Sequence, residues 1–576
     1  MGIKHAFWWF KNRYNKHIKP MRSGQSFSDI NVSIDNLMID MNGVFHNSAQ
    51  KIYQYGNCKP PARLLPLCNP RKRQPGLKAQ LRLFEDVCTT IEGLFTLTGP
   101  RKRLILCVDG PAPLSKQNQQ RQRRFRSAKE ADENCVFNSN CITPGTKFMD
   151  HLTKYIDWYL RKKITTDQRW RDIELIFSNE KAPGEGEHKI VNYIRYYGDR
   201  DETYCIHGMD ADLLMLSLGT HLPNFYILRD DVFDSAVVFN CVDIGAIRSL
   251  IISELQWSIG SPESFDGDRA INDFIFLFFM VGNDFLPHIP SIEIIEDGIE
   301  LILEVYKDVC KSHGHITRVA SGRVEFCPGP LAAFLGTIGH HEQENLERKV
   351  AKKESFFPDP LLEKCSRQGE RGAWHVDIAT YKQLYLEESF PADLEIEGIC
   401  HDYLEGMQWV LSYYTRGVPN WRWSYKYHYA PPASVLTEHV TSFEFPKYGR
   451  TLPSTPFQQL LCVLPPASAD LIPPPLSGLL TDERSPLRQY CPDDFAIDLS
   501  GKRREWEGIV ILPMVSFDLV LANYSEKVKQ VAPRELKRNV CGRSFKYEFD
   551  PGSTRTFNSF YGDIENCGAR STLIDL

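Results

Sequence analysis

Short apolar runs recur through the first half of the chain, separated by polar stretches. They predict strands at residues 34–40, 103–109, 173–177 and 203–206, and 225–228 adds a fifth. Strands that are apolar along their whole length are typical of a sheet buried on both faces, the usual setting of parallel strands. The first four runs each lead to one or two acidic residues.

Amphipathic helical patterns lie between these strands. Residues 81–94 and 146–160 carry apolar side chains at helical spacing, and Phe148, Leu152 and Ile156 share one face of the second pattern. Strands that alternate with helices predict an α/β fold with a doubly wound, mainly parallel sheet flanked by helices. Ligands bind beyond the carboxyl ends of the strands in such sheets. We therefore expect the acidic residues to converge at that edge.

Two pairs of carboxylates follow the later strands: Glu185 with Glu187, and Asp210 with Asp212. Residues two apart in extended backbone point to the same side, so each pair can direct both side chains to one point. For either pair alone, the simpler interpretation is a solvated acidic loop before a helix. The two pairs together favour a metal site, because clustered carboxylates repel unless they take up protons or share cations. Hard oxygen ligands select Mg²⁺, with Mn²⁺ as a substitute.

A further carboxylate follows the apolar helix predicted at residues 271–281. Asp284 either forms a simple Asx turn or joins the cluster as a seventh member. Seven carboxylates are too many for one Mg²⁺ and fit two ions, which can stabilise the attacking and leaving oxygens of phosphodiester hydrolysis. The seven are Asp40, Asp109, Glu185, Glu187, Asp210, Asp212 and Asp284.

A basic helix is predicted directly after the second strand, from about residue 115. Lys116, Gln120, Arg123 and Arg124 share one of its faces, because they are spaced at i, i+4, i+7 and i+8. Such a face beside a metal site can bind a terminal phosphate, arginine through paired hydrogen bonds. The alternative interpretations are a solvated basic helix and a localisation signal.

Composition limits the class of protein. The 576 residues are 42% hydrophobic, which indicates a globular chain of two or more domains. The formal net charge of −5 means that a polyanion must be bound by local basic patches. Sixteen scattered cysteines without a C-x-x-C pair are typical of an intracellular, reduced protein. The most apolar run, 274–281, is too short to cross a membrane, so no membrane association is expected.

Changes in composition along the chain predict three parts. Residues 1–305 form the α/β core with the metal site, 306–400 a polar connector, and 401–576 a second mixed α+β region that packs against the core and completes the substrate channel. Residues 47–76 have the character of a loop insertion. Aromatic residues at 419–431 either stack on bases or form an interdomain core.

With these residues placed, the chain resembles the XRN family of 5′→3′ exoribonucleases. The similar segments of the first block are residues 1–5, 40–46, 109–126, 184–189, 210–212 and 282–288. Those of the second block are residues 406–414, 421–431, 456–460, 463–468, 494–502 and 506–508. Long segments in the same order are far more specific than an isolated D-x-D.

The resemblance implies that the seven carboxylates bind two Mg²⁺ ions. It also implies that Lys116, Gln120, Arg123 and Arg124 form a pocket for a 5′-monophosphate. His46 corresponds to a histidine that stacks on the first base. Its partner is a tryptophan of the second block. We take it to be Trp421, with Trp409 and Trp423 as alternatives that the sequence does not separate.

The expected activity is processive 5′→3′ hydrolysis of single-stranded RNA with a 5′-monophosphate end, releasing nucleoside 5′-monophosphates in RNA turnover. The cytoplasm is the favoured location and the nucleus the alternative. Protein partners cannot be inferred. Two other functions compete: a flap-type, structure-specific endonuclease and a non-catalytic RNA-binding scaffold. All seven carboxylates are present, which argues against the scaffold. The residues alone do not distinguish RNA from DNA.

Overall fold

A mixed nine-stranded sheet forms the centre of the computed structural model, which describes residues 3, 5–56, 76–130, 137–231, 237–256, 264–352, 357–369 and 372–576. The strand order is β1-β7-β6-β5-β2-β3-β4-β14-β15. In that order the strands are Ile18–Met21, Phe239–Asp243, Phe225–Asp230, Tyr204–His207, Asn36–Asp40, Arg103–Cys107, Glu174–Ser178, Ser544–Phe549 and Ala569–Ile574.

The five central strands, β6-β5-β2-β3-β4, are parallel, which confirms the predicted doubly wound α/β fold. The outer strands differ from the prediction. β7 and β1 on one side, and β14 and β15 on the other, pair antiparallel, so the sheet as a whole is mixed. In chain order, β3 and β4 are added on one side of β2, whereas β5 and then β6 are added on its other side. The topological switch point, where ligands bind in such sheets, therefore lies beside β2.

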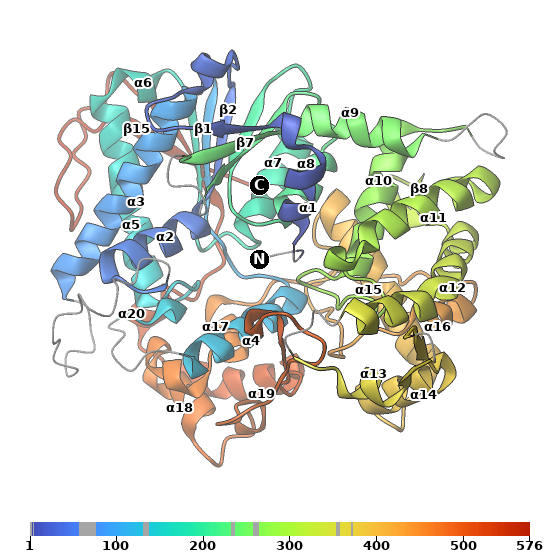
Figure 1. Ribbon diagram of the computed structural model, residues 1–576. Helices are drawn as coiled ribbons and strands as arrows, with labels where there is room; N and C mark the ends of the chain where they lie inside the picture. Colours follow the sequence, from blue (N-terminus) through green and yellow to red (C-terminus); the bar gives the residue numbers. More distant parts are fainter. Residues whose placement is uncertain are drawn as a thin grey trace, which may run out of the picture.

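Both faces of the sheet are buried. In β2, Leu37 and Ile39 belong to one apolar core and Met38 to the other, as strand alternation requires. Figure 1 shows α3 and α5 on one side of the sheet and α7 and α8 on the other. The helices that contribute to the first core include α2 (Met41–Tyr53), α3 (Leu77–Thr98) and α5 (Lys147–Thr166). Those that contribute to the second include α7 (Gly186–Tyr197), α8 (Asp212–Leu218), α9 (Ile244–Leu255), α10 (Gly267–Phe278) and α15 (Ile396–Arg416).

The stretch expected to be a polar connector is largely helical. It holds the second half of α11 (Gly298–His313), then α12 (Pro328–Lys352), α13 (Pro360–Lys364) and α14 (Ile378–Ser389), together with two short hairpins. On α12, Leu331, Phe334 and Ile338 lie at helical spacing and are buried in the same core as α7 and α8. The division at residues 305 and 400 stays a prediction.

The basic helix α4 (Leu114–Lys129) is held by its apolar side. Leu114 and Phe125 pack with Phe457 and Leu460 of α17 (Pro456–Val463) in a separate core. Figure 1 shows α17 beside α4, with α18 (Pro474–Thr481) and α19 (Phe517–Lys527) below them. Because the apolar side of α4 is buried there, its polar side is left for the cavity described below.

Two other expectations need correction or remain open. The supposed insertion at 47–76 begins inside α2, which continues to Tyr53, and residues 57–75 lie outside the described part of the chain. Within the described residues, no helix is long and apolar enough to span a membrane.

Candidate active site

The parallel strands bring the first acidic residues together. Asp40 ends β2 and lies opposite Cys107 of the adjacent strand β3, and Asp109 follows two residues later. Asn42 fixes Asp109 in two ways: its side-chain amide donates to Asp109 Oδ2 at 2.8 Å, and its oxygen accepts from the Asp109 main chain at 3.0 Å. Asn42 was not among the predicted site residues, although it lies in the segment 40–46.

The start of α7 completes this part of the edge. The main-chain nitrogen of Gly186 donates to Asp109 Oδ1 at 2.7 Å. A Cβ at Gly186 would lie 2.5 Å from Asp40 Oδ1 and 3.0 Å from the Cys107 carbonyl oxygen. Only glycine therefore lets the helix end approach Asp40 so closely. Glu185 precedes this glycine and Glu187 follows it, and both side chains are buried.

The second acidic pair lies at the end of β5, next to β2. Asp212 opens α8 and is only 1% exposed, with its Oδ1 accepting from the main-chain nitrogen of Ile3 at 3.0 Å. The main-chain oxygen of Asp210 accepts from Arg229 at 2.8 Å. The structure thus brings a residue from the start of the chain against the acidic cluster, which spacing in the sequence could not reveal.

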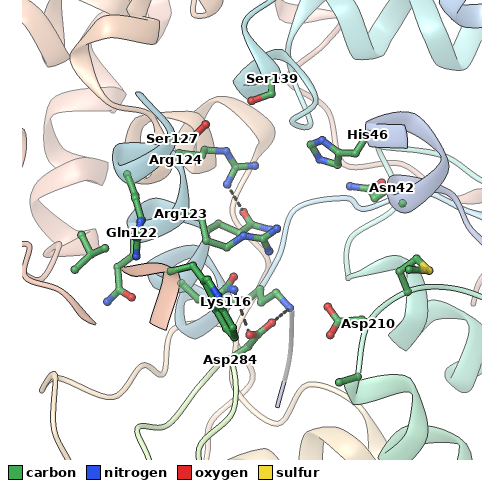
Figure 2. Close-up of a pocket in the computed structure, with 18 of the residues that line it drawn as sticks. Asn42, His46, Lys116, Gln122, Arg123, Arg124, Ser127, Ser139, Asp210 and Asp284 are labelled. Atoms are coloured by element: carbon green, nitrogen blue, oxygen red, sulfur yellow. Dashed lines mark hydrogen bonds and ion pairs between the residues drawn. The ribbon is translucent and has the colours of Figure 1, made fainter. Parts of the chain in front are cut away.

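Asp284 reaches the same cluster from the turn after α10 and the short helix Phe279–Val281. Lys116 Nζ donates to Asp284 Oδ2 at 2.7 Å and forms an ion pair with Glu185 Oε2. Gln119 donates to Asp284 Oδ1 at 3.2 Å. Figure 2 shows Lys116 and Asp284 together at the foot of α4. Lys116 therefore lies among the carboxylates, at one end of the face predicted for a phosphate.

Burial and mutual repulsion raise the pKa of several carboxyl groups in the cluster. Burial, and then the charges of Asp109 and Asp210, raise the pKa of Asp40 well above its usual range. Burial also raises the pKa of Glu187 well above normal, with Asp210 as the next cause. Burial raises the pKa of Glu185 to about 7 against the opposing effect of Lys116. The cluster thus carries more carboxylates than it can keep charged without additional cations.

The donor atoms fit divalent cations. Asp40 Oδ1 and Glu187 Oε2 are buried and have no hydrogen-bond partner among the residues that the structure describes, and both are hard carboxylate oxygens of the kind that Mg²⁺ and Mn²⁺ prefer. Among the described residues, however, no three His, Cys, Asp or Glu side chains already surround one point as metal ligands would. Binding an ion there would require side-chain shifts, and Lys116 is the cation that now lies among these carboxylates.

The other end of the α4 face carries two arginines. Arg124 donates to Gln120 Oε1 at 3.2 Å and to Thr143 Oγ1 at 2.9 Å. Burial, and then repulsion from Arg123, lower the pKa of Arg124 to about 9. Among the described residues, no carboxylate forms an ion pair with either guanidinium. Two adjacent cations without a bound anion are suited to a phosphate group.

His46, on α2, faces these arginines. Figure 2 shows His46 and Asn42 on one side of the cavity and Arg123 and Arg124 on the other. Burial, and then the charges of Arg123 and Arg124, lower the pKa of His46 to about 4, so its imidazole is neutral at physiological pH. A neutral flat ring opposite a cationic face can stack on a base whose phosphate is bound by the arginines.

The structure does not bring the three tryptophans of the prediction to His46. Trp409 is fully buried and stacks on Trp423, with ring centroids 4.9 Å apart. Trp421 is absent from the cavity wall formed by the described residues, and its carbonyl accepts from the Leu114 nitrogen at the start of α4. Stacking of Trp421 on His46 stays a prediction. Trp506, which is 56% exposed, does line the cavity, and its place in the segment 506–508 was the available signal.

One continuous cavity of about 2780 Å³ joins these groups. Asp212, which is almost fully buried, is the one predicted carboxylate that does not line it. The predicted residues on the wall are Asp40, His46, Asp109, Lys116, Gln120, Arg123, Arg124, Glu185, Glu187, Asp210 and Asp284. An acidic edge and a cationic helix therefore face one cavity, an arrangement that is suited to a ligand that carries phosphate.

Comparison with known proteins identifies the family. The model described as "XRN 5′-3′ exonuclease N-terminus" matches residues 1–231, and the one described as "Xrn1 helical domain" matches residues 264–373 and 375–547. Together they cover most of the chain, and the protein belongs to the XRN family. The resemblance of both sequence blocks is confirmed.

Three relatives show how far the similarity extends. The chain is 29% identical to 5′-3′ exoribonuclease 1 of Homo sapiens, covering 100% of this chain and 37% of that protein. It is 27% identical to 5′-3′ exoribonuclease 1 of Saccharomyces cerevisiae, covering 98% and 46%. It is 29% identical to the 5′-3′ exoribonuclease 2 homolog of Drosophila melanogaster, covering 95% and 73%. The chain thus spans less than half the length of the first two.

Among solved structures, a chain of the catalytic core of Rad2 in complex with DNA substrate matches with a TM-score of 0.32 and 15% identity. The match covers 71% of this chain and 85% of that one. A TM-score this low does not establish a common overall fold.

Proposed function

We propose that this protein is a divalent-cation-dependent 5′→3′ exoribonuclease that degrades single-stranded RNA from a 5′-monophosphate end in RNA turnover. The observation that carries the proposal is that one cavity is lined by a carboxylate cluster containing Lys116 and by two arginines, Arg123 and Arg124, that pair with no carboxylate among the described residues. Family membership and the names of the relatives support it.

The 5′ end would bind at the arginine end of α4. A terminal monophosphate carries close to two negative charges at neutral pH and an internal phosphodiester one, so Arg123 and Arg124 gain most from the terminal group. Gln120 supplies a neutral donor, and Lys116 adds a third cation toward the scissile bond. His46 would stack on the first base, with Trp421 proposed as its partner after a shift toward the cavity.

The carboxylates would hold the cations: Asp40, Asp109, Glu185, Glu187, Asp210, Asp212 and Asp284. Two Mg²⁺ or Mn²⁺ ions held by these carboxylates would activate a water and would stabilise the attacking and leaving oxygens. Asn42 and the Gly186 main chain hold Asp109 in orientation. The Ile3 main chain does the same for Asp212. Each cut leaves a new 5′-phosphate, which can enter the arginine pocket while the chain is still bound, and this gives processivity.

End-labelled RNA tests the proposal. A 5′-phosphorylated single strand carrying a label at either end is incubated with the protein and Mg²⁺. The 5′ label should appear at once as a mononucleotide, and the 3′-labelled strand should shorten with no early mononucleotide. Early release of the 3′ label would reverse the polarity, and internal fragments would indicate the endonuclease alternative. Binding without cleavage would indicate the scaffold.

A further inference from the structure

A buried tyrosine of α15 contacts the acidic cluster. Tyr413 is 1% exposed, and its hydroxyl donates a hydrogen bond to Glu185 Oε1 at 2.9 Å. The two residues are 228 positions apart, on opposite sides of the boundary between the two family blocks. The other carboxylate oxygen of Glu185 contacts Lys116. One oxygen is therefore fixed by a neutral donor and the other faces a replaceable cation.

The tyrosine ring is held on several sides. Its closest ring contact is with His188, parallel at 3.6 Å between centroids and 3° between planes. Phe285 packs edge-on at 5.6 Å, and Trp409 lies at 5.2 Å. His188 is one helical turn after Glu185 on α7, and Phe285 follows Asp284. The ring thus connects two acid-bearing segments, and its hydroxyl has little freedom to leave Glu185.

We propose that Tyr413 is a positioning residue that orients the Glu185 carboxylate for cation binding, with His188 stacked beneath it to fix the ring. Hydrogen-bond partners of this kind orient metal ligands, and their removal typically lowers metal affinity or activity about 10- to 100-fold. A neutral hydroxyl suits this role because, unlike Lys116, it orients the carboxylate without adding a positive charge that competes with the metal. The inference rests on the proposed function, since it assumes that Glu185 is a ligand.

Tyr413→Phe is the direct test, because it keeps the ring and its stacking and removes only the hydroxyl. Mn²⁺ binding to the 576-residue chain without RNA is followed by the electron paramagnetic resonance signal of free Mn²⁺. We expect the apparent Kd to rise about tenfold. In assays with 5′-phosphorylated RNA at limiting metal, kcat should fall while KM stays unchanged, because the arginine end of α4 is untouched.

Tyr403→Phe is the matched control. Tyr403 is equally buried on the same helix, and its hydroxyl donates to the Pro287 carbonyl oxygen at 3.0 Å, not to a carboxylate. It should leave the Mn²⁺ affinity at the wild-type value. An equal loss in both variants would mean that α15 has loosened as a whole, and would overturn the inference.

A double-mutant cycle with Glu185→Gln locates the effect. If the hydroxyl acts through Glu185, adding Tyr413→Phe to Glu185→Gln should weaken Mn²⁺ binding no further. A full tenfold loss in that background would overturn the inference. If the wild type binds Mn²⁺ and Tyr413→Phe binds it equally well, the inference fails while the proposed function stands. If the wild type binds no Mn²⁺, both fail.

Discussion

Lys116 donates a 2.7 Å hydrogen bond to Asp284 across 168 positions of sequence, in the middle of the carboxylate cluster. Both side chains are buried, so this ammonium group is a principal neutralising charge for the acids. Burial opposes the charge, but Asp284 and then Glu185 raise the pKa of Lys116 well above normal. The lysine therefore remains charged, and a divalent cation that enters the cluster must share these oxygens with it or displace it.

Lys116→Gln should consequently lower the stability of the metal-free protein and increase its response to metal. Removing one partner of a buried ion pair costs about 3 kcal/mol, because the remaining carboxylates lose their counter-charge. Mg²⁺ can replace that charge. We expect a lower melting temperature in chelator and a larger rise on adding Mg²⁺ than in the wild type, both measured by thermal unfolding.

Lys349→Gln is the matched control for this measurement. Lys349 is a largely buried lysine that pairs with Glu293 at 2.8 Å, away from the acidic cluster. Its replacement should also lower the melting temperature, but Mg²⁺ should raise that temperature only as much as in the wild type. Equal Mg²⁺ responses in all three proteins would place the stabilising ion away from Lys116.

Asp210→Asn and Asp212→Asn should each lower hydrolysis at least about a hundredfold, the scale on which loss of an electrostatic stabiliser acts. RNA binding should persist, because Arg123 and Arg124 bind the 5′ end independently. Cleavage of 5′-phosphorylated RNA and filter binding in chelator provide the two measurements. Asp230→Asn is the control, since Asp230 also lines the cavity but is engaged by Asn47 at 3.0 Å and His207 at 3.3 Å. If Asp230→Asn is equally inactive, the chemistry is not confined to the seven acids.

Gly186→Ala should reduce activity with little loss of fold. The added methyl group would lie 2.5 Å from Asp40 Oδ1, so the carboxylate must move before any other group. Gly93→Ala is the matched substitution: nothing lies within 4 Å of a Cβ there, inside α3, and alanine should stabilise the helix by about 0.5–1 kcal/mol. Cleavage rates and melting temperatures of both variants separate the effects. Full activity in Gly186→Ala would show that Asp40 tolerates displacement.

The central strands and their acids were predictable because both signals are local. Each parallel strand is one apolar run, and Asp40 and Asp109 follow their runs directly. The antiparallel strand β14 was missed because its pairing of Phe545 with Phe177 joins the C-terminal stretch to β4, and no pattern within either segment encodes it. The connector was interpreted as polar because the second half of α12 is rich in charged residues, although Leu331, Phe334 and Ile338 of the same helix are buried in the core.

The prediction of the site residues from the sequence was limited in the same way. The four residues on α4 could be placed on one face by helical spacing alone, and all four line the cavity. Spacing could not show that Lys116 would contact Asp284, nor that Tyr413 would reach Glu185, because both contacts depend on how distant helices pack. The sequence did not decide between Trp409, Trp421 and Trp423 for a related reason: these residues lie in strongly aromatic segments whose burial depends on tertiary packing, and stacking of Trp421 on His46 stays a prediction.

The last prediction concerns how the two arginines on α4 select the 5′ end of the RNA. Arg123 and Arg124 have no carboxylate partners among the described residues, so an anion that enters their end of the cavity gains their full attraction. A terminal phosphate carries more charge and more acceptor oxygens than a phosphodiester, whereas a hydroxyl end would leave the cations unpaired. Losing one charged contact costs about 1.5–3 kcal/mol, or roughly one to two decades in efficiency.

Arg123→Ala and Arg124→Ala should therefore lower kcat/KM for 5′-phosphorylated RNA by about 10- to 100-fold and change it little for 5′-hydroxyl RNA. Arg126→Ala is the control on the same helix. Its guanidinium is already bound by Glu130 at 2.6 Å and by the Glu505 carbonyl oxygen at 2.7 Å, so the preference for phosphate should survive its loss. Both RNAs are compared with all four proteins at equal metal concentration. If Arg123→Ala and Arg124→Ala slow both RNAs by the same factor, the two arginines attract the backbone in general, and the pocket that reads the 5′ end lies elsewhere on the cavity wall.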